Sequence, residues 1–402
     1  MVAVNPEILI WARKTAALSV EEAARKLGFR DSKRHTAVEK LELLEKGEDE
    51  RGKIEPTRSQ LNAMARVYRQ PLLVFYLRKP PKKGDRGEDF RSLQQSSSNP
   101  RENAYLDILM RNVKAAQSIV RDLLEDDETE RLDFVGSARM DMGEEAIAES
   151  ISNKLNFDLQ RFRSRRSYSD AFGYLRDQIE GLGIFVLRLS DLGNYHTSIP
   201  ADVFRGFVYA DPIAPFVVIN RNDAKSAYSF TAIHELAHIW IGSSGISGEL
   251  GHDTNNAIEH FCDRVAARLL LPEKDLDTIG YLRRATNVEL VTKIGGLSSE
   301  WKVSRTMIAY NLLHHDIISF SRWETLSMQF RQEYLKQKQL EKDERDSREN
   351  RPINMNGILR NNLGKRLVDH ARAWLAEGTL TPSKASVVLS VTPRRVDAIL
   401  NP

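Results

Sequence analysis

The segment FTAIHELAHIW, residues 230–240, constrains the fold more than any other part of this sequence. Its apolar positions recur at intervals of three and four, which predicts an amphipathic helix: they are Phe230, Ile233, Ala237 and Trp240. His234 and His238 stand four residues apart, so both rings can point from one helix face at the same ion. Glu235 is rotated by about 100° from His234 and can reach the ion's surroundings without binding it. Two imidazoles that hold Zn²⁺ and a carboxylate that takes a proton from the attacking water are the parts of a metal hydrolase.

A third ligand is expected further along the chain. Glu259 follows His238 by 21 residues, in AIEHFCDRVAARLLLP, whose apolar spacing predicts a second helix that ends at Pro272. Glu259 can complete a His₂Glu set. Asp263 lies one turn further and can accept the second ring N–H of a ligand histidine, which fixes its tautomer.

Two alternatives compete with this interpretation. An HExxH pattern also arises by chance, and His234 would then be a hydrogen-bonded core histidine. The carboxylate pair on the second helix favours the metal site. His260 is a competing third ligand, but it projects about 100° away from Glu259 on a helix. The pattern with a third histidine six residues after the second is absent, because Ser244 stands there.

Upstream, FRGFVYADPIAPFVVINRND contains two apolar runs around an Asp-Pro turn. Residues 216–220 have the β-branched character of a strand. A strand beside the histidine helix offers an edge to which an extended peptide pairs. An ordinary core strand is the simpler alternative.

These segments resemble the ImmA/IrrE family of zinc metallopeptidases: VVIN at 217–220, FTAIHELAHIWIG at 230–242 and IEHFCDRVAARLLLP at 258–272. The resemblance covers about residues 140–320. It implies a cytoplasmic, gluzincin-like protease that cleaves a partner regulatory protein and relieves repression of stress or mobile-element genes. The ligand roles carry over to His234, His238 and Glu259 and the base role to Glu235. Many relatives have Asn where this chain has Asp263. Tyr209, Tyr228 and His196 are the candidates for oxyanion stabilisation.

The N-terminal region predicts five short helices, at 6–17, 19–28, 36–46, 57–68 and 71–77. Ser19 and Glu22 form a capping box for the second of them. This order resembles the Xre (lambda-repressor-like) helix-turn-helix domain, in which the helix at 36–46 would enter the major groove.

The candidate nucleic-acid contacts of this domain are Arg30, Lys33, Arg34, His35 and Lys40, which suit phosphate. Carboxylates on the same helix, at Glu39, Glu42 and Glu45, repel phosphate unless they are turned inward or paired. The alternative is a helical domain that docks a protein partner.

Two later segments have helix-turn-helix character. The first begins at residue 289 and reads ELVTKIGGLSSEWKVSRTMIAYNLLHH. It is either a helix-turn-helix or, in a protease, a lobe that docks the substrate. Residues 362–400 alternate helix, turn and cap twice, at Thr381 and Thr392, and carry Arg394 and Arg395. This second segment suits nucleic acid or a protein partner.

Composition agrees with a cytoplasmic protein whose fold is mainly α with a small β-sheet. The 402-residue chain has a net charge of +3 and one cysteine, Cys262, so no internal disulfide is expected. It begins without a signal-peptide pattern and lacks an apolar run of membrane length. We expect an Xre-like domain at 1–79, a linker at 80–103, a gluzincin-like peptidase domain at 104–320, a charged helical linker at 321–353 and a small helical domain at 354–402.

These observations favour a zinc protease with a DNA-binding domain, which cleaves a repressor, an antitoxin or itself. Its expected partners are a protein encoded nearby and operator DNA bound through residues 1–79, with a homodimer possible and no membrane. The alternative is an antitoxin that neutralises a PIN-type or similar toxin by binding and uses the peptidase fold as a platform. A transcription factor with a degenerate peptidase domain fits less well, because the HExxH pattern and Glu259 are intact.

Overall fold

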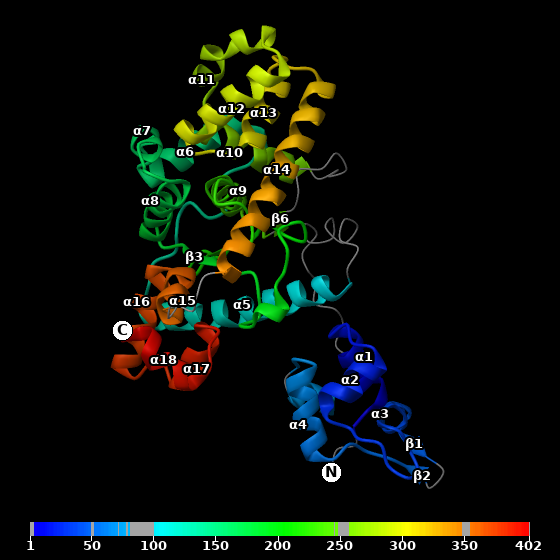
Figure 1. The fold of residues 1–402 in the computed structure, drawn as a ribbon. Helices are drawn as coiled ribbons and strands as arrows, with labels where there is room; N and C mark the ends of the chain where they lie inside the picture. The colour runs from blue at the N-terminus through cyan, green and yellow to red at the C-terminus, as the bar shows by residue number, and fades with distance from the viewer. Residues whose placement is uncertain are drawn as a thin grey trace. The chain divides into compact units, whose positions relative to one another are not determined.

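The structure is a computed structural model that describes residues 4–49, 52–70, 72–77, 79–80, 100–244, 246–247, 257–347 and 354–401. It confirms a mainly α fold with a small β-sheet (Figure 1). The chain divides into two units. The first comprises residues 1–111 and 191–199, and the second comprises residues 112–190 and 200–402.

Short, well-capped helices build the first unit. They are α1 (Pro6–Thr15), α2 (Val20–Leu27), α3 (Ala37–Lys46), α4 (Arg58–Val67) and the 3₁₀ helix η1 (Leu72–Tyr76). The antiparallel hairpin of β1 (Glu48–Asp49) and β2 (Gly52–Lys53) lies between α3 and α4. A second 3₁₀ helix, η4 (Tyr195–Thr197), belongs to the same unit. The expected capping box of Ser19 and Glu22 is present. The fifth expected helix is a 3₁₀ turn, and the hairpin was not predicted.

One carboxylate of α3 points into the first unit. Glu45 is buried and pairs in a bidentate manner with Arg13 of α1, at 2.7 and 2.9 Å. Glu39 accepts the backbone N–H of Thr36 and thereby caps its own helix. Of the three acidic residues that would oppose phosphate, Glu45 is therefore buried in an ion pair, and Glu39 caps its helix while it remains exposed.

The second unit is organised around a four-stranded sheet. Its strands are β3 (Phe185–Arg188), β4 (Gly206–Tyr209), β5 (Phe216–Ile219) and β6 (Ile246–Ser247), in the order β3-β5-β4-β6. The β3–β5 pair is parallel, and the other pairs are antiparallel. Because strand residues alternate between faces, each strand contributes to two cores.

The position of β5 corrects one expectation. The strand at 216–220 was a candidate edge for peptide pairing, but β5 lies between β3 and β4, and all four of its residues are buried. Its continuous apolar sequence suits a strand covered on both faces. The edge on this side of the sheet is β6, next to β4.

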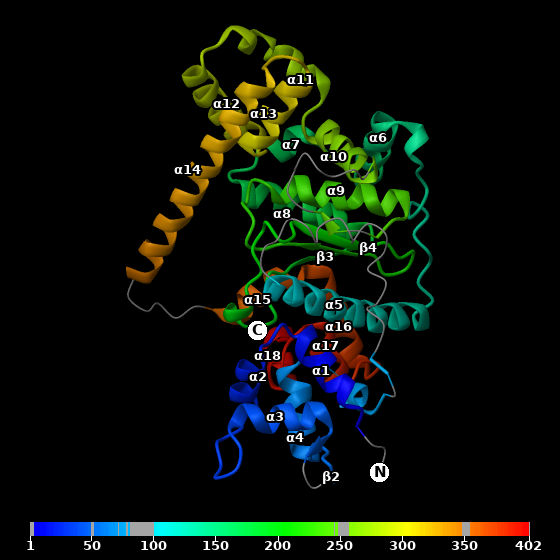
Figure 2. The ribbon, with the colours of Figure 1, turned by 90° about the vertical axis from the view of Figure 1, so that its right-hand side faces the viewer.

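Helix α9 (Tyr228–Ile241), which carries the HExxH pattern, packs on one face of the sheet. It is buried along almost its whole length rather than on one stripe, because α6 (Glu144–Leu155), α8 (Tyr168–Gly181) and α10 (Ala257–Leu270) surround it. Helix α10 is the expected second helix and ends before Pro272. Figure 2 shows α9 above the strands, with α10 beside it.

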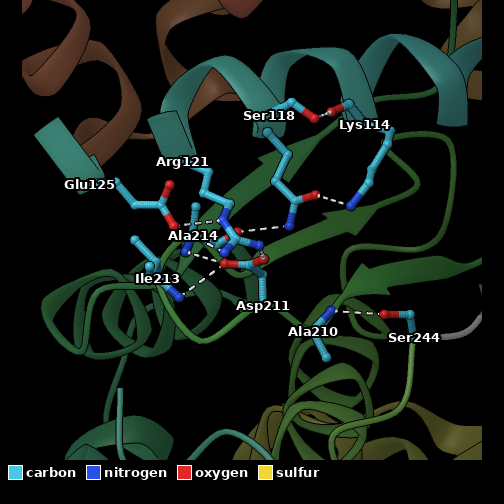
Figure 3. Close-up of polar contacts among 10 residues, drawn as sticks. Lys114, Ser118, Arg121, Glu125, Ala210, Asp211, Ile213, Ala214 and Ser244 are labelled. Atoms are coloured by element: carbon cyan, nitrogen blue, oxygen red, sulfur yellow. Dashed lines mark hydrogen bonds and ion pairs between the residues drawn. The ribbon is translucent and has the colours of Figure 1, made fainter. Parts of the chain in front are cut away.

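Helix α5 (Pro100–Asp126) covers the other face of the sheet with its C-terminal half (Figure 2). Arg121 forms an ion pair at 2.8 Å with Asp211, in the turn between β4 and β5. Asp211 in turn accepts the backbone N–H groups of Ile213 and Ala214. Buried Gln117 donates to the carbonyl oxygen of Ala214. These bonds, drawn in Figure 3, fix the turn that follows β4.

The remaining helices extend the second unit at both ends. They are η3 (Met140–Met142), α7 (Leu159–Arg163), α11 (Glu273–Thr278), η5 (Gly280–Arg284), α12 (Asn287–Trp301), α13 (Arg305–His314), α14 (Phe320–Ser347), α15 (Met355–Leu363), α16 (Lys365–Glu377), α17 (Pro382–Val388) and α18 (Pro393–Leu400).

A buried ionic cluster attaches the C-terminal helices to the sheet. Arg176 of α8 pairs with Glu180 at 3.1 Å and donates to the carbonyl oxygens of Asn361 and Asn362, at the end of α15. It also donates to the carbonyl oxygen of Val186 in β3. Gly364, at φ +87°, is required here because a Cβ would lie 2.2 Å from a Glu180 carboxylate oxygen. The helices α15 and α16 are therefore anchored by polar groups and not only by apolar packing.

Within the described residues, no helix is long and apolar enough to cross a membrane. Most of the expected linker, residues 81–99, lies outside the described residues, as do residues 348–353 of the charged segment. The boundaries of the five expected segments stay predictions.

Candidate metal centre

His234, His238 and Glu259 come together between α9 and α10. Their ligand atoms all lie within 4.8 Å of one another, and all three residues are buried. The two Nε2 atoms are 3.2 Å apart. Glu259 places Oε2 at 3.2 Å from the first histidine and Oε1 at 3.1 Å from the second. The helix period supplies the histidine pair, and the packing of α10 on α9 supplies the carboxylate.

Both histidine rings are oriented by a hydrogen bond at Nδ1, the ring nitrogen that does not face the other ligand residues. The Nδ1 atom of His234 lies 2.9 Å from a carboxylate oxygen of Asp263. The Nδ1 atom of His238 lies 2.9 Å from the hydroxyl oxygen of Ser243. A ring that donates through Nδ1–H keeps its Nε2 lone pair for a metal, so both contacts select the tautomer that binds a cation.

The carboxylates dominate the electrostatics of this group. Burial by itself lowers the pKa of His234, but hydrogen bonds with Asp263 and Glu259 outweigh it and raise that pKa well above its ordinary value. Burial raises the pKa of Glu259, and its bonds to His234 and His238 outweigh this effect and lower it. The site therefore stabilises positive charge, which is the condition for binding a divalent cation.

The donor set fits zinc. Two atoms bound to a tetrahedral Zn²⁺ at about 2.05 Å lie about 3.3 Å apart, close to the observed separations of 3.1 and 3.2 Å. Two imidazole nitrogens and one carboxylate are a common catalytic zinc set, which leaves one position for water or substrate. The three residues are therefore placed to bind a metal ion.

Glu235 is fully buried beside the ligand group and faces β4. A Cβ on Gly206 would lie 2.6 Å from its Oε1 atom and 2.7 Å from the methyl carbon of Thr231. The backbone of β4 thus approaches the carboxylate as closely as a residue without a side chain permits. Gly206 leaves the space that Glu235 occupies.

The comparison with protein families adds an independent observation. Residues 180–313 match the model of the IrrE N-terminal-like domain. No curated protein and no solved structure matches the chain. The matched segment runs from the end of α8 to α13 and includes every residue of the ligand group. The matched domain is thus similar to metallopeptidases of the ImmA/IrrE type.

His260, the competing ligand, is not a member of the metal-binding group found among the described residues. Its neighbour Glu259 faces the histidines instead, as the rotation of about 100° per residue requires.

Two of the three candidates for oxyanion stabilisation, Tyr209 and Tyr228, direct their side chains to groups other than the ligand residues. Tyr209 is three residues after Gly206 in β4 and therefore lies on the opposite face of the sheet from Glu235. Its ring packs under the Lys114 ammonium of α5, 5.1 Å from the ring centroid. Tyr228 donates its hydroxyl to the carbonyl oxygen of Arg221. His196 is exposed in η4 of the first unit.

The candidate nucleic-acid contacts lie on and before α3. Arg30, Lys33 and Arg34 are exposed, and His35 is half-buried. Lys40 donates to the carbonyl oxygen of Arg30 at 2.6 Å and so fastens the preceding loop to the helix.

Two residues of the candidate metal centre were not predicted. Ser243 follows Gly242, which ends α9 in the left-handed conformation at φ +79°. That C-cap turns the chain back onto His238, and the glycine at the helix end was its only signal. Gly206 lies inside an apolar strand pattern, where glycine indicates a close approach of backbone to another group.

Proposed function

We propose that this protein is a zinc-dependent endopeptidase that cleaves a partner regulatory protein. The convergence of two histidines and one carboxylate around a common point, with a buried carboxylate next to them, is the observation that carries the proposal. The match of residues 180–313 to the IrrE N-terminal-like domain supports it.

In this proposal, different side chains bind the metal, transfer the proton and orient the ligands. His234, His238 and Glu259 would hold Zn²⁺, which when bound activates water and polarises the scissile carbonyl group. Glu235 would accept the proton of the attacking water and transfer it to the leaving amine. Asp263 and Ser243 would hold the two imidazoles in the metal-binding tautomer.

The substrate would approach along the β4 side of the sheet. Gly206 of β4 lies against Glu235, so a peptide extended along this edge passes beside the base. The two-residue strand β6 pairs with this part of β4, at Gly206–Ser247 and Phe207–Ile246. A substrate segment would therefore extend the sheet at β6 or replace it.

For the N-terminal domain, we propose binding to operator DNA through α3 and the loop before it. Arg30, Lys33 and Arg34 there are exposed, whereas Glu45 is turned inward onto Arg13. Residues 1–79 carry 16 Lys or Arg and 11 Asp or Glu, a net charge of +5 that favours phosphate.

The decisive test compares the purified wild-type chain with Glu235→Gln. Both are analysed for zinc, and both are incubated with the product of the neighbouring gene. We expect one zinc ion in each protein and cleavage only by the wild type. The turnover of the variant should fall by about 100-fold or more, since general-base catalysis contributes 10²–10⁴.

Each other outcome changes the conclusion. Cleavage by Glu235→Gln at the wild-type rate would refute the role of Glu235. One zinc ion in both proteins with a stable, uncleaved complex would favour an antitoxin that uses the peptidase fold as a platform. Absence of zinc from both would leave the histidine helix as the core of a former enzyme.

A further inference from the structure

The last four helices carry a feature that the metal centre does not use. Helices α17 and α18 pack against each other and against α16, and four residues, 389–392, connect them (Figure 1). Ser390, at φ +51°, takes the left-handed conformation within this turn. Two short helices joined by a tight turn, with a third helix behind them, form a helix-turn-helix.

Burial divides α18 into two faces. Val396, Ile399 and Leu400 are buried in the C-terminal helices. Arg394 and Ala398, one turn apart, are exposed on the opposite face. The exposed side of α18 therefore combines small and cationic side chains with one carboxylate, that of Asp397.

A second helix pair in the same unit serves as an internal comparison. Helices α12 and α13 are also joined by a short turn, 302–304, but α14 packs over α13. Arg305, at the start of α13, is paired with Glu333 of α14 at 2.5 Å. Helix α18 packs against α15, α16 and α17, and Arg394 and Arg395 in its first turn remain exposed.

The net charge of the C-terminal helices favours a nucleic acid as their partner. Residues 354–401 contain seven Lys or Arg and three Asp or Glu, a net charge of +4, whereas residues 104–353 have a net charge of −7. Lys384 of α17 is exposed near the start of the first helix of the pair, where a helix-turn-helix meets the DNA backbone. Arg395 reaches Asn356 of α15 at 3.0 Å, which holds its guanidinium at the base of α18.

We propose that α17 and α18 form a DNA-binding helix-turn-helix, with α18 in the major groove of duplex DNA. Arg394 and Arg395 contact bases or phosphates at the N-terminal end of α18, and Lys384 contacts the backbone. The site shares no residue with the candidate metal centre or with α3, so it would be a second DNA-binding region of this chain.

The test uses the full-length chain and a fluorescein-labelled duplex of mixed sequence, with binding followed by anisotropy over a range of salt concentrations. Its key pair is Ala398→Glu and Ala398→Lys. Both residues are good helix formers, so the two variants differ on the exposed face of α18 in charge alone. We expect Ala398→Glu to weaken binding and Ala398→Lys to strengthen it, each by about threefold to tenfold.

A second set removes charge. The double variant Arg394→Ala/Arg395→Ala should bind about tenfold more weakly, and the slope of log K against log salt should fall by about 0.9 for each lost phosphate contact. Lys365→Ala is the matched control, because Lys365 is exposed at the other end of the module, at the start of α16. Its removal should leave the slope unchanged, and melting curves verify that all variants are folded.

A background with Arg30, Lys33 and Arg34 changed to Ala separates this site from the N-terminal domain. Retained binding that still responds to the Ala398 pair supports the proposal. Complete loss of binding in that background, no binding by the wild type, or equal binding by Ala398→Glu and Ala398→Lys would each overturn it. The last result would assign the exposed face of α18 to a protein partner.

Discussion

The second unit contains two buried ionic clusters that look alike in composition and differ in geometry. Around Arg176, a cation meets an anion, and the remaining donors of the guanidinium end on backbone carbonyl oxygens. Around His234, three groups that accept a cation converge within 4.8 Å. Opposite charges that satisfy each other hold helices together, whereas like ligand atoms that converge create a place for an ion.

The difference is also visible in what surrounds each cluster. Glu180 accepts the backbone N–H of Arg366 at the first turn of α16, so both of its oxygens serve the protein itself. Asp263 and Ser243 instead turn the histidine rings so that both Nε2 atoms face the common point. The hydrogen bonds around Arg176 use the oxygens of Glu180 within the protein, whereas those around His234 leave both Nε2 atoms oriented toward a metal ion.

The largest expected effect is on metal binding in Glu259→Ala. This change removes one of three ligands, so zinc affinity should fall by more than about 100-fold, because loss of an outer partner alone costs 10–100-fold. Competition with a chelator measures the affinity. His260→Ala is the control, and it should bind zinc as the wild type does. Loss of zinc from the control and not from Glu259→Ala would exchange the two roles.

Glu180→Ala should instead lower the stability of the protein and leave its zinc binding unchanged. It leaves the Arg176 guanidinium buried without its carboxylate, which should lower the free energy of unfolding by about 3–5 kcal/mol. Denaturant titration of both proteins measures this loss. Zinc stoichiometry should remain one ion per chain. A variant that unfolds normally but loses zinc would show that the two clusters are not independent.

A smaller effect is expected from the residues behind the histidines. Asp263→Ala should reduce zinc affinity by about 10–100-fold, as removal of an outer hydrogen-bond partner does. Asp263→Asn keeps an acceptor for the Nδ1–H of His234 and should lose less. Chelator competition compares the two variants. Equal losses would mean that the carboxylate acts through its charge and not through the orientation of the ring.

The smallest expected change concerns Gly206. An added Cβ would lie 2.6 Å from Oε1 of Glu235, so Gly206→Ala should displace the base and lower turnover by about tenfold. Zinc content should not change. Gly295→Ala in α12 is the matched control, since nothing lies within 4 Å of its Cβ position. Full activity of Gly206→Ala would show that Glu235 does not need its present position.

Much of the candidate site could be predicted from local sequence, because the positions of residues within one helix follow a fixed period. The helical period places His234 and His238 on one face of α9 and Glu259 and Asp263 on one face of α10. Side-chain and backbone groups within four residues explain the capping box of Ser19 and Glu22 in the same way. None of these relations needs knowledge of a distant contact.

Tertiary structure decided everything that depends on which elements meet. Pairing of β5 with two neighbours made it a central strand and moved the sheet edge to β6. The approach of β4 to α9 made Gly206 part of the candidate metal centre, and the turn after α9 brought in Ser243. The sequence by itself determined the three candidate ligands and the helices that carry them. Only long-range packing decided which backbone lies beside Glu235, because contact between distant segments has no period that a sequence can show.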